Sequence, residues 1–307
     1  MVTYNLSEQF RYFFNRLNPS PTYISKATSE YNAIKELIEN KVTPELSPVC
    51  FLQGSYKQQT AIYTINDIDL VVLCQGLSMG SSSGEGRKWS RNEIFSTIAS
   101  PILNNERYRD KVLFHDLSMC IKIDLGIKIE ILPVVNNQQE KSEPFRAYHP
   151  EKGKWENVYP RIHQMMLTWK NSKEKTNGNF IPAIKVFKHI RSKYGLDISS
   201  FHIECLLFSM PDNIFLGSPL TFISSILNYF ARSSASAWYD IVINQPSGDK
   251  NIFVPTECSY EKWLDFHHCM SILSKLAQLT VNSADKNLII EAWQVILGDN
   301  YFPRQVS

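Results

Sequence analysis

The most informative stretch of this chain is residues 51–73, which read FLQGSYKQQTAIYTINDIDLVVL. A short apolar run leads into Gly54-Ser55. Glycine lets the backbone approach an anion closely, and a serine hydroxyl with free backbone N–H groups can hold phosphate oxygens. Asp67 and Asp69 follow, and side chains two residues apart on a β-strand point to the same face. The stretch therefore predicts a phosphate-binding turn followed by a strand that carries paired carboxylates.

Two adjacent carboxylates repel one another, and a divalent cation is the usual way to offset that repulsion. Mg²⁺ prefers carboxylate oxygens together with the phosphates of a substrate. A hard metal ion, a triphosphate and a strand-borne carboxylate pair are the components of two-metal phosphoryl or nucleotidyl transfer. Such a site requires a third carboxylate, for which the predicted hairpin over 120–135 offers Glu130. Asp124, on the preceding strand, is the alternative.

Around this stretch the sequence predicts an α/β-type first half. Apolar residues at helical spacing predict helices over 4–16 and 24–40. Short apolar runs of β type come next: 49–52, 67–73, 111–114, 119–125 and 127–135. The last two predict a hairpin that turns at Gly126. Residues 77–90 are rich in Gly and Ser and predict a mobile loop, which a helix over 91–104 follows.

The second half of the chain has a helical pattern. The predicted helices are 159–170, 180–193, 201–209, 219–233, 261–279 and 283–297. We therefore expect an α+β fold with a mixed sheet in the first domain, residues 1–158, and a helical second domain, residues 159–307. The crevice between two such halves is the natural place for a ligand.

Composition excludes several classes of protein. Of 307 residues, 43% are hydrophobic and 20% are charged, which excludes disordered and collagen-like chains. The formal net charge of +2 does not indicate a strongly basic nucleic-acid-binding face. The six cysteines form no CxxC pair and no zinc-ligand spacing, so we expect reduced thiols. Without a signal peptide or a membrane-spanning apolar stretch, the expected location is the cytoplasm.

The catalytic motif resembles that of a known superfamily. The order Gly-Ser, Asp-Ile-Asp and an acidic residue on a later apolar strand is similar to the DNA polymerase β-like nucleotidyltransferases. Within that superfamily the chain resembles the bacterial cGAS/DncV-like nucleotidyltransferases (CD-NTases), and specifically their E clade. The similar segments occur in the same order along both: LQGSYKQQT (52–60), KWENVYPRIH (154–163), IPAIKVFKHIR (181–191) and SSFHIECLLFSMPD (199–212). The resemblance implies a polymerase β-like core, then a helical domain, with the active site in the cleft between them.

The resemblance also implies residue roles. The metal-binding and catalytic set, for two Mg²⁺ ions that Mn²⁺ can replace, is Asp67, Asp69 and Glu130. The set that holds the triphosphate of the donor nucleotide is Gln53, Gly54, Ser55, Lys188 and Ser200. The family usually has aspartate where this chain has Glu130. An extra methylene moves the carboxylate by about 1 Å, a scale to which catalytic geometry is sensitive, so a slower or Mn²⁺-preferring enzyme is an alternative.

As a function, the resemblance implies synthesis of a cyclic di- or oligonucleotide second messenger from ATP or other NTPs, with release of pyrophosphate. Its implied context is bacterial anti-phage (CBASS) signalling, in which a separate effector protein responds to the product. No membrane is expected as a partner. Nucleic acid is not required, although an RNA activator is compatible with the sequence.

Two alternatives remain open at this point. One is a nucleotidyltransferase that modifies RNA or protein. The other is a nucleotide-binding module in which Glu130 has weakened catalysis. The bases of the product also remain open, because the E-clade asparagine linked to pyrimidine selection is Val158 here, and Asn157 lies one residue earlier.

Overall fold

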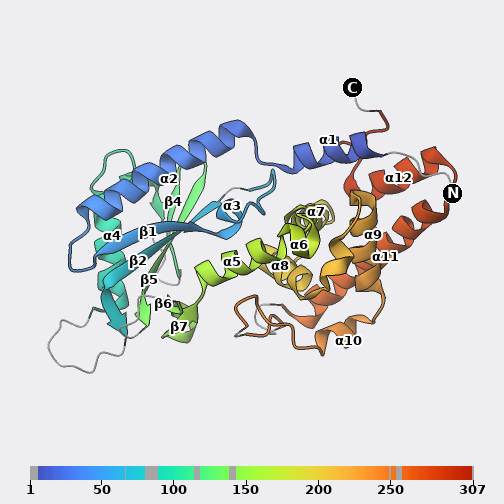
Figure 1. The fold of residues 1–307 in the computed structure, drawn as a ribbon. Helices are drawn as coiled ribbons and strands as arrows, with labels where there is room; N and C mark the ends of the chain where they lie inside the picture. Colours follow the sequence, from blue (N-terminus) through green and yellow to red (C-terminus); the bar gives the residue numbers. More distant parts are fainter. Residues whose placement is uncertain are drawn as a thin grey trace. The chain divides into compact units, whose positions relative to one another are not determined.

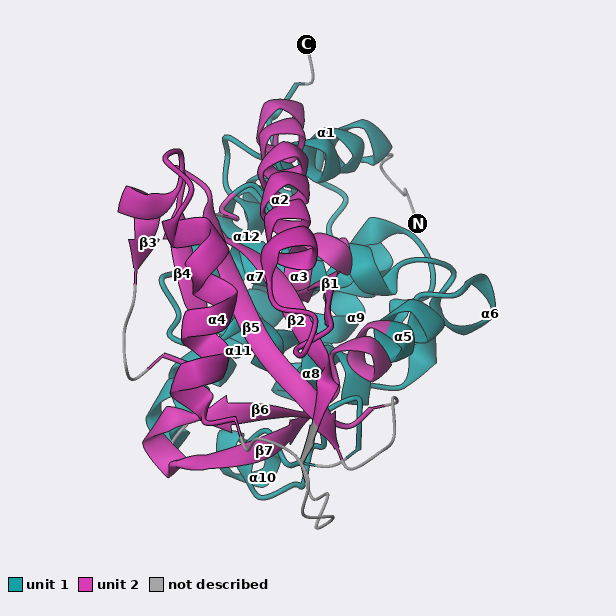
Figure 2. Cartoon of the chain, turned by 90° about the vertical axis from the view of Figure 1, so that its left-hand side faces the viewer, with its two compact units in different colours: residues 1–19, 60–63, 165–307 teal, residues 20–59, 64–164 magenta. Residues whose placement is uncertain are grey.

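The structure is a computed structural model of the whole chain. The residues it describes are 6–65, 67–79, 89–113, 118–137, 143–248, 250–253 and 258–305. Their contacts divide the chain into two compact units (Figure 2). Unit 1 comprises residues 1–19, 60–63 and 165–307, and unit 2 comprises residues 20–59 and 64–164. The domain limits expected from the sequence, 1–158 and 159–307, stay a prediction.

Unit 2 contains a mixed β-sheet, as the sequence predicts (Figure 1). In the described residues its strands are β1 (Pro48–Gln53), β2 (Asp67–Met79), β3 (Val112–Leu113), β4 (Ile121–Asp124), β5 (Lys128–Asn137), β6 (Phe145–His149) and β7 (Lys154–Val158). The order across the sheet is β1-β2-β5-β4-β3, and β6 pairs with β5 and β7. β2 and β5 run parallel, and the other pairs are antiparallel.

The helices of unit 2 include α2 (Pro21–Lys41), α3 (Gly54–Lys57) and α4 (Arg91–Leu103), with the short 3₁₀ helices η1 (Arg109–Lys111) and η2 (Pro150–Lys152). α2 and α4 cover one face of the sheet (Figure 2). Alternation along β2 explains why: Leu70 and Val72 point into the apolar core under these helices. The residues between them point to the opposite face, where Asp67 and Asp69 lie.

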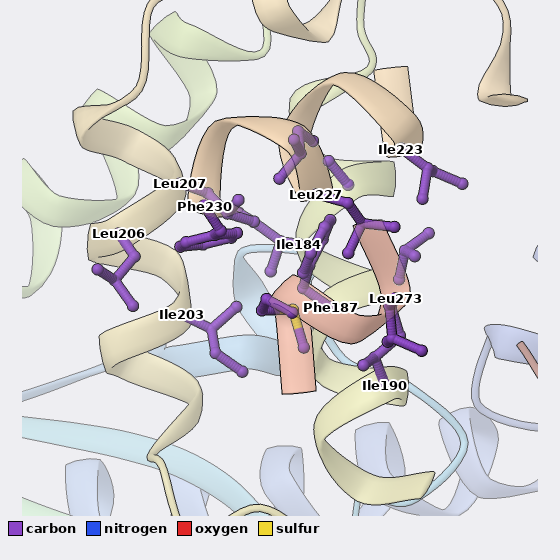
Figure 3. Packing of buried hydrophobic residues seen from close by; sticks show 14 of the residues in the cluster. Ile184, Phe187, Ile190, Ile203, Leu206, Leu207, Ile223, Leu227, Phe230 and Leu273 are labelled. Carbon is purple, nitrogen blue, oxygen red and sulfur yellow. The ribbon is translucent and has the colours of Figure 1, made fainter. Parts of the chain in front are cut away.

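Unit 1 is helical. It contains most of α5 (Pro160–Lys170), together with α1 (Ser7–Leu17), α6 (Lys173–Thr176), α7 (Phe180–Lys193), α8 (Ser200–Ser209), η3 (Asp212–Phe215), α9 (Pro219–Ala231), α10 (Ala235–Tyr239), α11 (Tyr260–Asn282) and α12 (Lys286–Leu297). α7 is central, because Ile184, Phe187 and Ile190 recur along its length and pack against side chains of α8, α9 and α11 (Figure 3). No helix in the described parts of the chain is both long and apolar enough to cross a membrane.

The sequence prediction differs from the structure at several elements, among them β2, β6 and β7. β6 and β7 were not predicted, because their strands alternate only weakly and carry many polar residues. β2 continues through residues 77–79, where the sequence predicts a loop. Gly76 lies within this strand, and its backbone is so close to Glu45 that a Cβ would meet the Glu45 carbonyl oxygen at 2.0 Å. The rest of the predicted loop, residues 80–88, lies outside the described residues.

Candidate active site

The turn after β1 brings the backbone against the carboxylate of Asp69. Gly54, the first residue of α3, has a φ of +67°. A Cβ at this position would lie 1.7 Å from Oδ2 of Asp69, so only glycine fits without displacing that side chain. Gln53 and Ser55 flank Gly54, and both are half-buried. The predicted phosphate-binding turn and the predicted carboxylate strand are therefore in direct contact.

A row of polar side chains crosses the sheet at this level. Gln53 on β1 pairs with Asp69 on β2, and Asp69 pairs with Glu130 on β5. Glu130 in turn pairs with Lys122 on β4. Residues directly opposite one another on neighbouring strands share a face of the sheet, and Asp67 joins that face by alternation. The structure thus brings together the three carboxylates that the sequence predicts.

The third carboxylate is bound to a lysine. Lys122 Nζ donates to Glu130 Oε1 at 2.6 Å, and the two side chains are 43% and 24% exposed. This hydrogen bond raises the pKa of Lys122; burial opposes the shift, while the charges of Glu130 and Asp67 support it. Just before β4, burial raises the pKa of the Cys120 thiol to about 12, and the nearby carboxylates of Glu130 and Asp69 add to the effect.

Sequence reasoning missed Lys122, although a signal for it was present. A hairpin centred on Gly126 pairs residues that are equally distant from it, which places Lys122 opposite Glu130. Gly126 has the positive φ, +71°, that such a turn favours. Asp124, the alternative third carboxylate, accepts a hydrogen bond from the Gly126 N–H at 2.9 Å. It stabilises the turn and is exposed.

The donor set suits a hard divalent cation, because it consists of carboxylate oxygens on one sheet face. Within the described ranges, however, no group of three or more His, Cys, Asp or Glu side chains is arranged to hold a metal ion. Glu130 instead directs its carboxylate to Lys122. The residues fit a metal site whose third ligand has a competing partner.

Lys188 and Ser200 belong to unit 1 and are engaged within it. Lys188 Nζ donates to Glu204 Oε1 at 2.6 Å and to Thr60 Oγ1 at 2.9 Å, and the Thr60 hydroxyl donates to the same Glu204 oxygen at 2.7 Å. Lys188 and Glu204 are only 4% and 6% exposed. Ser200 Oγ accepts a hydrogen bond of 3.0 Å from Arg191.

Asn157, the residue next to the expected base-selecting position, lies on β7. Its Oδ1 accepts a hydrogen bond of 3.0 Å from Arg146 Nη1, and Arg146 Nη2 donates to the carbonyl oxygen of Trp155 at 2.6 Å. Arg146 and Asn157 are direct partners across the β6–β7 ladder. The side-chain oxygen of Asn157 is therefore already hydrogen-bonded, and its side-chain NH₂ group is the part left for a further contact.

Comparison with known proteins gives matches over most of the chain. A model described as the Second Messenger Oligonucleotide or Dinucleotide Synthetase domain matches residues 4–171. A second model, the cGAS/DncV-like nucleotidyltransferase C-terminal helical domain, matches residues 168–279.

Individual relatives agree with these matches. A cyclic UMP-AMP synthase from Rhodothermus marinus is 28% identical over 236 residues, covering 68% of this chain and 80% of the relative. The cyclic nucleotide synthase CdnE01 from Staphylococcus haemolyticus is 25% identical over 249 residues, covering 68% and 82%. The solved structure of Rhodothermus marinus CdnE c-UMP-AMP synthase with Apcpp and Upnpp shares the fold, with a TM-score of 0.69 and 22% identity over 89% of this chain and 97% of that one.

Proposed function

The chain belongs to the cGAS/DncV-like nucleotidyltransferases, and from that membership we propose that it joins NTPs into a cyclic di- or oligonucleotide second messenger. The observation that carries the proposal is the cross-strand register of Asp69 with Glu130, with Gly54 packed against Asp69. A pure binding module has no need for three carboxylates on one sheet face beside a phosphate-binding turn.

In the proposed reaction, a hydroxyl of one nucleotide attacks the α-phosphorus of another. A new P–O bond forms, the bond to the β-phosphate oxygen breaks, and pyrophosphate leaves; a second round closes the ring. Glu130 accepts a hydrogen bond from the attacking hydroxyl, orients it, and takes up its proton as the P–O bond forms. Asp67, Asp69 and Glu130 would hold two Mg²⁺ ions, which supply charge neutralisation at the transferring phosphate when bound.

The triphosphate of the donor nucleotide would lie at the turn formed by Gln53, Gly54 and Ser55. Lys188 and Ser200 are proposed as further phosphate contacts from unit 1. Lys188 Nζ already donates to Thr60 and Glu204, so this role would use the third N–H of its ammonium group.

The proposed partners are NTP substrates, such as ATP, and an effector protein that responds to the product in anti-phage signalling. Two relatives named as cyclic nucleotide synthases support the product class. One solved relative was captured with Apcpp and Upnpp, which supports NTPs as the substrate class.

The test is to incubate the purified protein with all four NTPs and either Mg²⁺ or Mn²⁺, digest with phosphatase, and identify products by mass spectrometry. We expect a phosphatase-resistant cyclic species, and its mass names the bases. The double variant Asp67→Asn/Asp69→Asn should lose this product, because two neutral amides cannot replace the carboxylates as metal ligands.

The matched control is Asp124→Asn, which removes a carboxylate from the same sheet face but outside the proposed metal set. It should retain the product. Transfer of a nucleotide to RNA or to protein, with no cyclic species under either metal, would contradict the proposal. Glu130→Asp then tests whether the longer side chain limits the reaction.

A further inference from the structure

We propose that Lys122 occupies the third carboxylate in place of a metal ion, so that this lysine sets the divalent-cation concentration at which the site fills. The inference rests on the proposed function, because it assumes that Glu130 is a metal ligand. It concerns a residue that lies outside the expected catalytic set, on the strand beyond it.

The geometry makes Lys122 a direct competitor for Glu130. The two residues are opposite one another on antiparallel strands, and Nζ lies 2.6 Å from Oε1. A bound cation and the ammonium group of Lys122 would compete for the same carboxylate, that of Glu130. The charge of Asp67 also acts on Lys122, so the lysine lies within electrostatic range of a second proposed ligand.

A purely structural role explains the pair less well. Both side chains are partly exposed, at 43% and 24%, and ion pairs in that setting contribute little to folding stability because water and salt screen them. The main effect of removing Lys122 should therefore appear in cation affinity and not in the unfolding transition.

The test measures Mn²⁺ binding to the full chain without nucleotide, by electron paramagnetic resonance of the free ion. Lys122→Gln should bind Mn²⁺ about tenfold more tightly than the wild type, because the change removes both a competing ion pair and a repelling positive charge. Lys122→Arg keeps both and should stay near the wild-type affinity.

Lys128→Gln is the charge-matched control. Lys128 is exposed and lies on the same sheet face, opposite Asp67. Its loss should tighten binding by no more than about threefold, because the effect of an exposed charge is screened. Urea unfolding of all variants verifies that each is folded.

The outcomes separate the two proposals. If the wild type binds Mn²⁺ and Lys122→Gln binds no more tightly than Lys128→Gln, Lys122 does not compete with the ion and this inference is overturned alone. If neither the wild type nor Lys122→Gln binds more Mn²⁺ than Asp67→Asn/Asp69→Asn, the carboxylates hold no ion without nucleotide and this inference is overturned, while the product assay with the four NTPs decides the proposed function. Tenfold tightening in Lys122→Gln, absent in Lys122→Arg, supports the inference.

Discussion

Gly54 combines a positive φ with a close approach to Asp69, and its two constraints can be separated by mutation. Gly54→Ala should shift the urea midpoint by the equivalent of about 1–2 kcal/mol from left-handed backbone strain. It should also reduce nucleotide turnover by about 100-fold, because the new Cβ would lie 1.7 Å from Asp69 Oδ2 and must displace that carboxylate.

Gly153→Ala is the matched control. Gly153 also has a positive φ, +59°, but a Cβ there would meet nothing within 4 Å. Gly153→Ala should therefore show the same decrease in the urea midpoint but keep the wild-type rate of nucleotide turnover. Equal turnover in the two variants would show that the contact between Gly54 and Asp69 is not needed for activity.

At the level of single residues, the sequence predicts a strand that carries Asp67 and Asp69, and both lie on β2. The spacing of Asp67 and Asp69 predicts a shared face because alternation on a strand is a local property. The contact of Gly54 with Asp69 depends on how the turn after β1 lies against β2, which is a property of the tertiary fold, so local pattern alone could not predict it. The pairing of Lys122 with Glu130, in contrast, follows from the local hairpin at Gly126.

At the level of elements, part of the segment between α3 and β2 packs with the helical unit and not with the sheet unit. Residues 60–63 belong to unit 1, although the chain on both sides belongs to unit 2. Thr60 is fully buried and bonded to the Lys188–Glu204 ion pair. Tyr63 donates its backbone N–H to the carbonyl oxygen of Leu17 at 2.8 Å.

Glu204→Ala should destabilise unit 1 by about 3–5 kcal/mol, because it leaves the charge of Lys188 buried without its partner. The double variant Lys188→Met/Glu204→Leu should recover most of the loss, since apolar side chains of similar volume replace the pair. Urea unfolding followed by tryptophan fluorescence measures both. A loss below about 1 kcal/mol for Glu204→Ala would show that the pair is not a structural anchor.

The predicted helices of unit 1 and most strands of unit 2 are confirmed because strong apolar periodicity fixes them locally. α3 escapes prediction because it has only four residues, GSYK, and no apolar face. β6 and β7 are found only through their pairing with β5 and with each other. For such strands the hydrogen-bonding partner, and not the local pattern, determines the structure.

For the molecule as a whole, a buried histidine makes stability depend on pH. His189 is 1% exposed, and its Nε2 lies 2.7 Å from the carbonyl oxygen of Leu297. A carbonyl can only accept, so Nε2 carries the proton and Nδ1 accepts from Tyr63. Burial lowers the pKa of His189 from its ordinary 6.5, against an opposing effect of the Leu297 carbonyl.

The direction of this pH effect follows from the linkage between protonation and folding. The ring is neutral in the folded chain, whereas in the unfolded chain it takes up a proton as the pH falls through its ordinary value. The contribution of neutral His189 to folding stability is therefore complete above the ordinary pKa of histidine. It is lost as the pH falls below that value. The urea midpoint should decrease from pH 7.5 to pH 5.5, and less steeply in His189→Gln. Exposed His268→Gln should keep the wild-type slope; a His189→Gln slope equal to it would contradict the assignment.

The course of the chain also bears on how such a protein can evolve by exchange of parts. It passes between the units at residues 19–20, 59–60, 63–64 and 164–165. A single recombination point near residue 165 would therefore transfer most of the helical unit without α1 and without residues 60–63, which are bonded inside it. New combinations of sheet and helical units require these distant segments to be inherited together, so drift by point substitution is the easier route to diversity within this architecture.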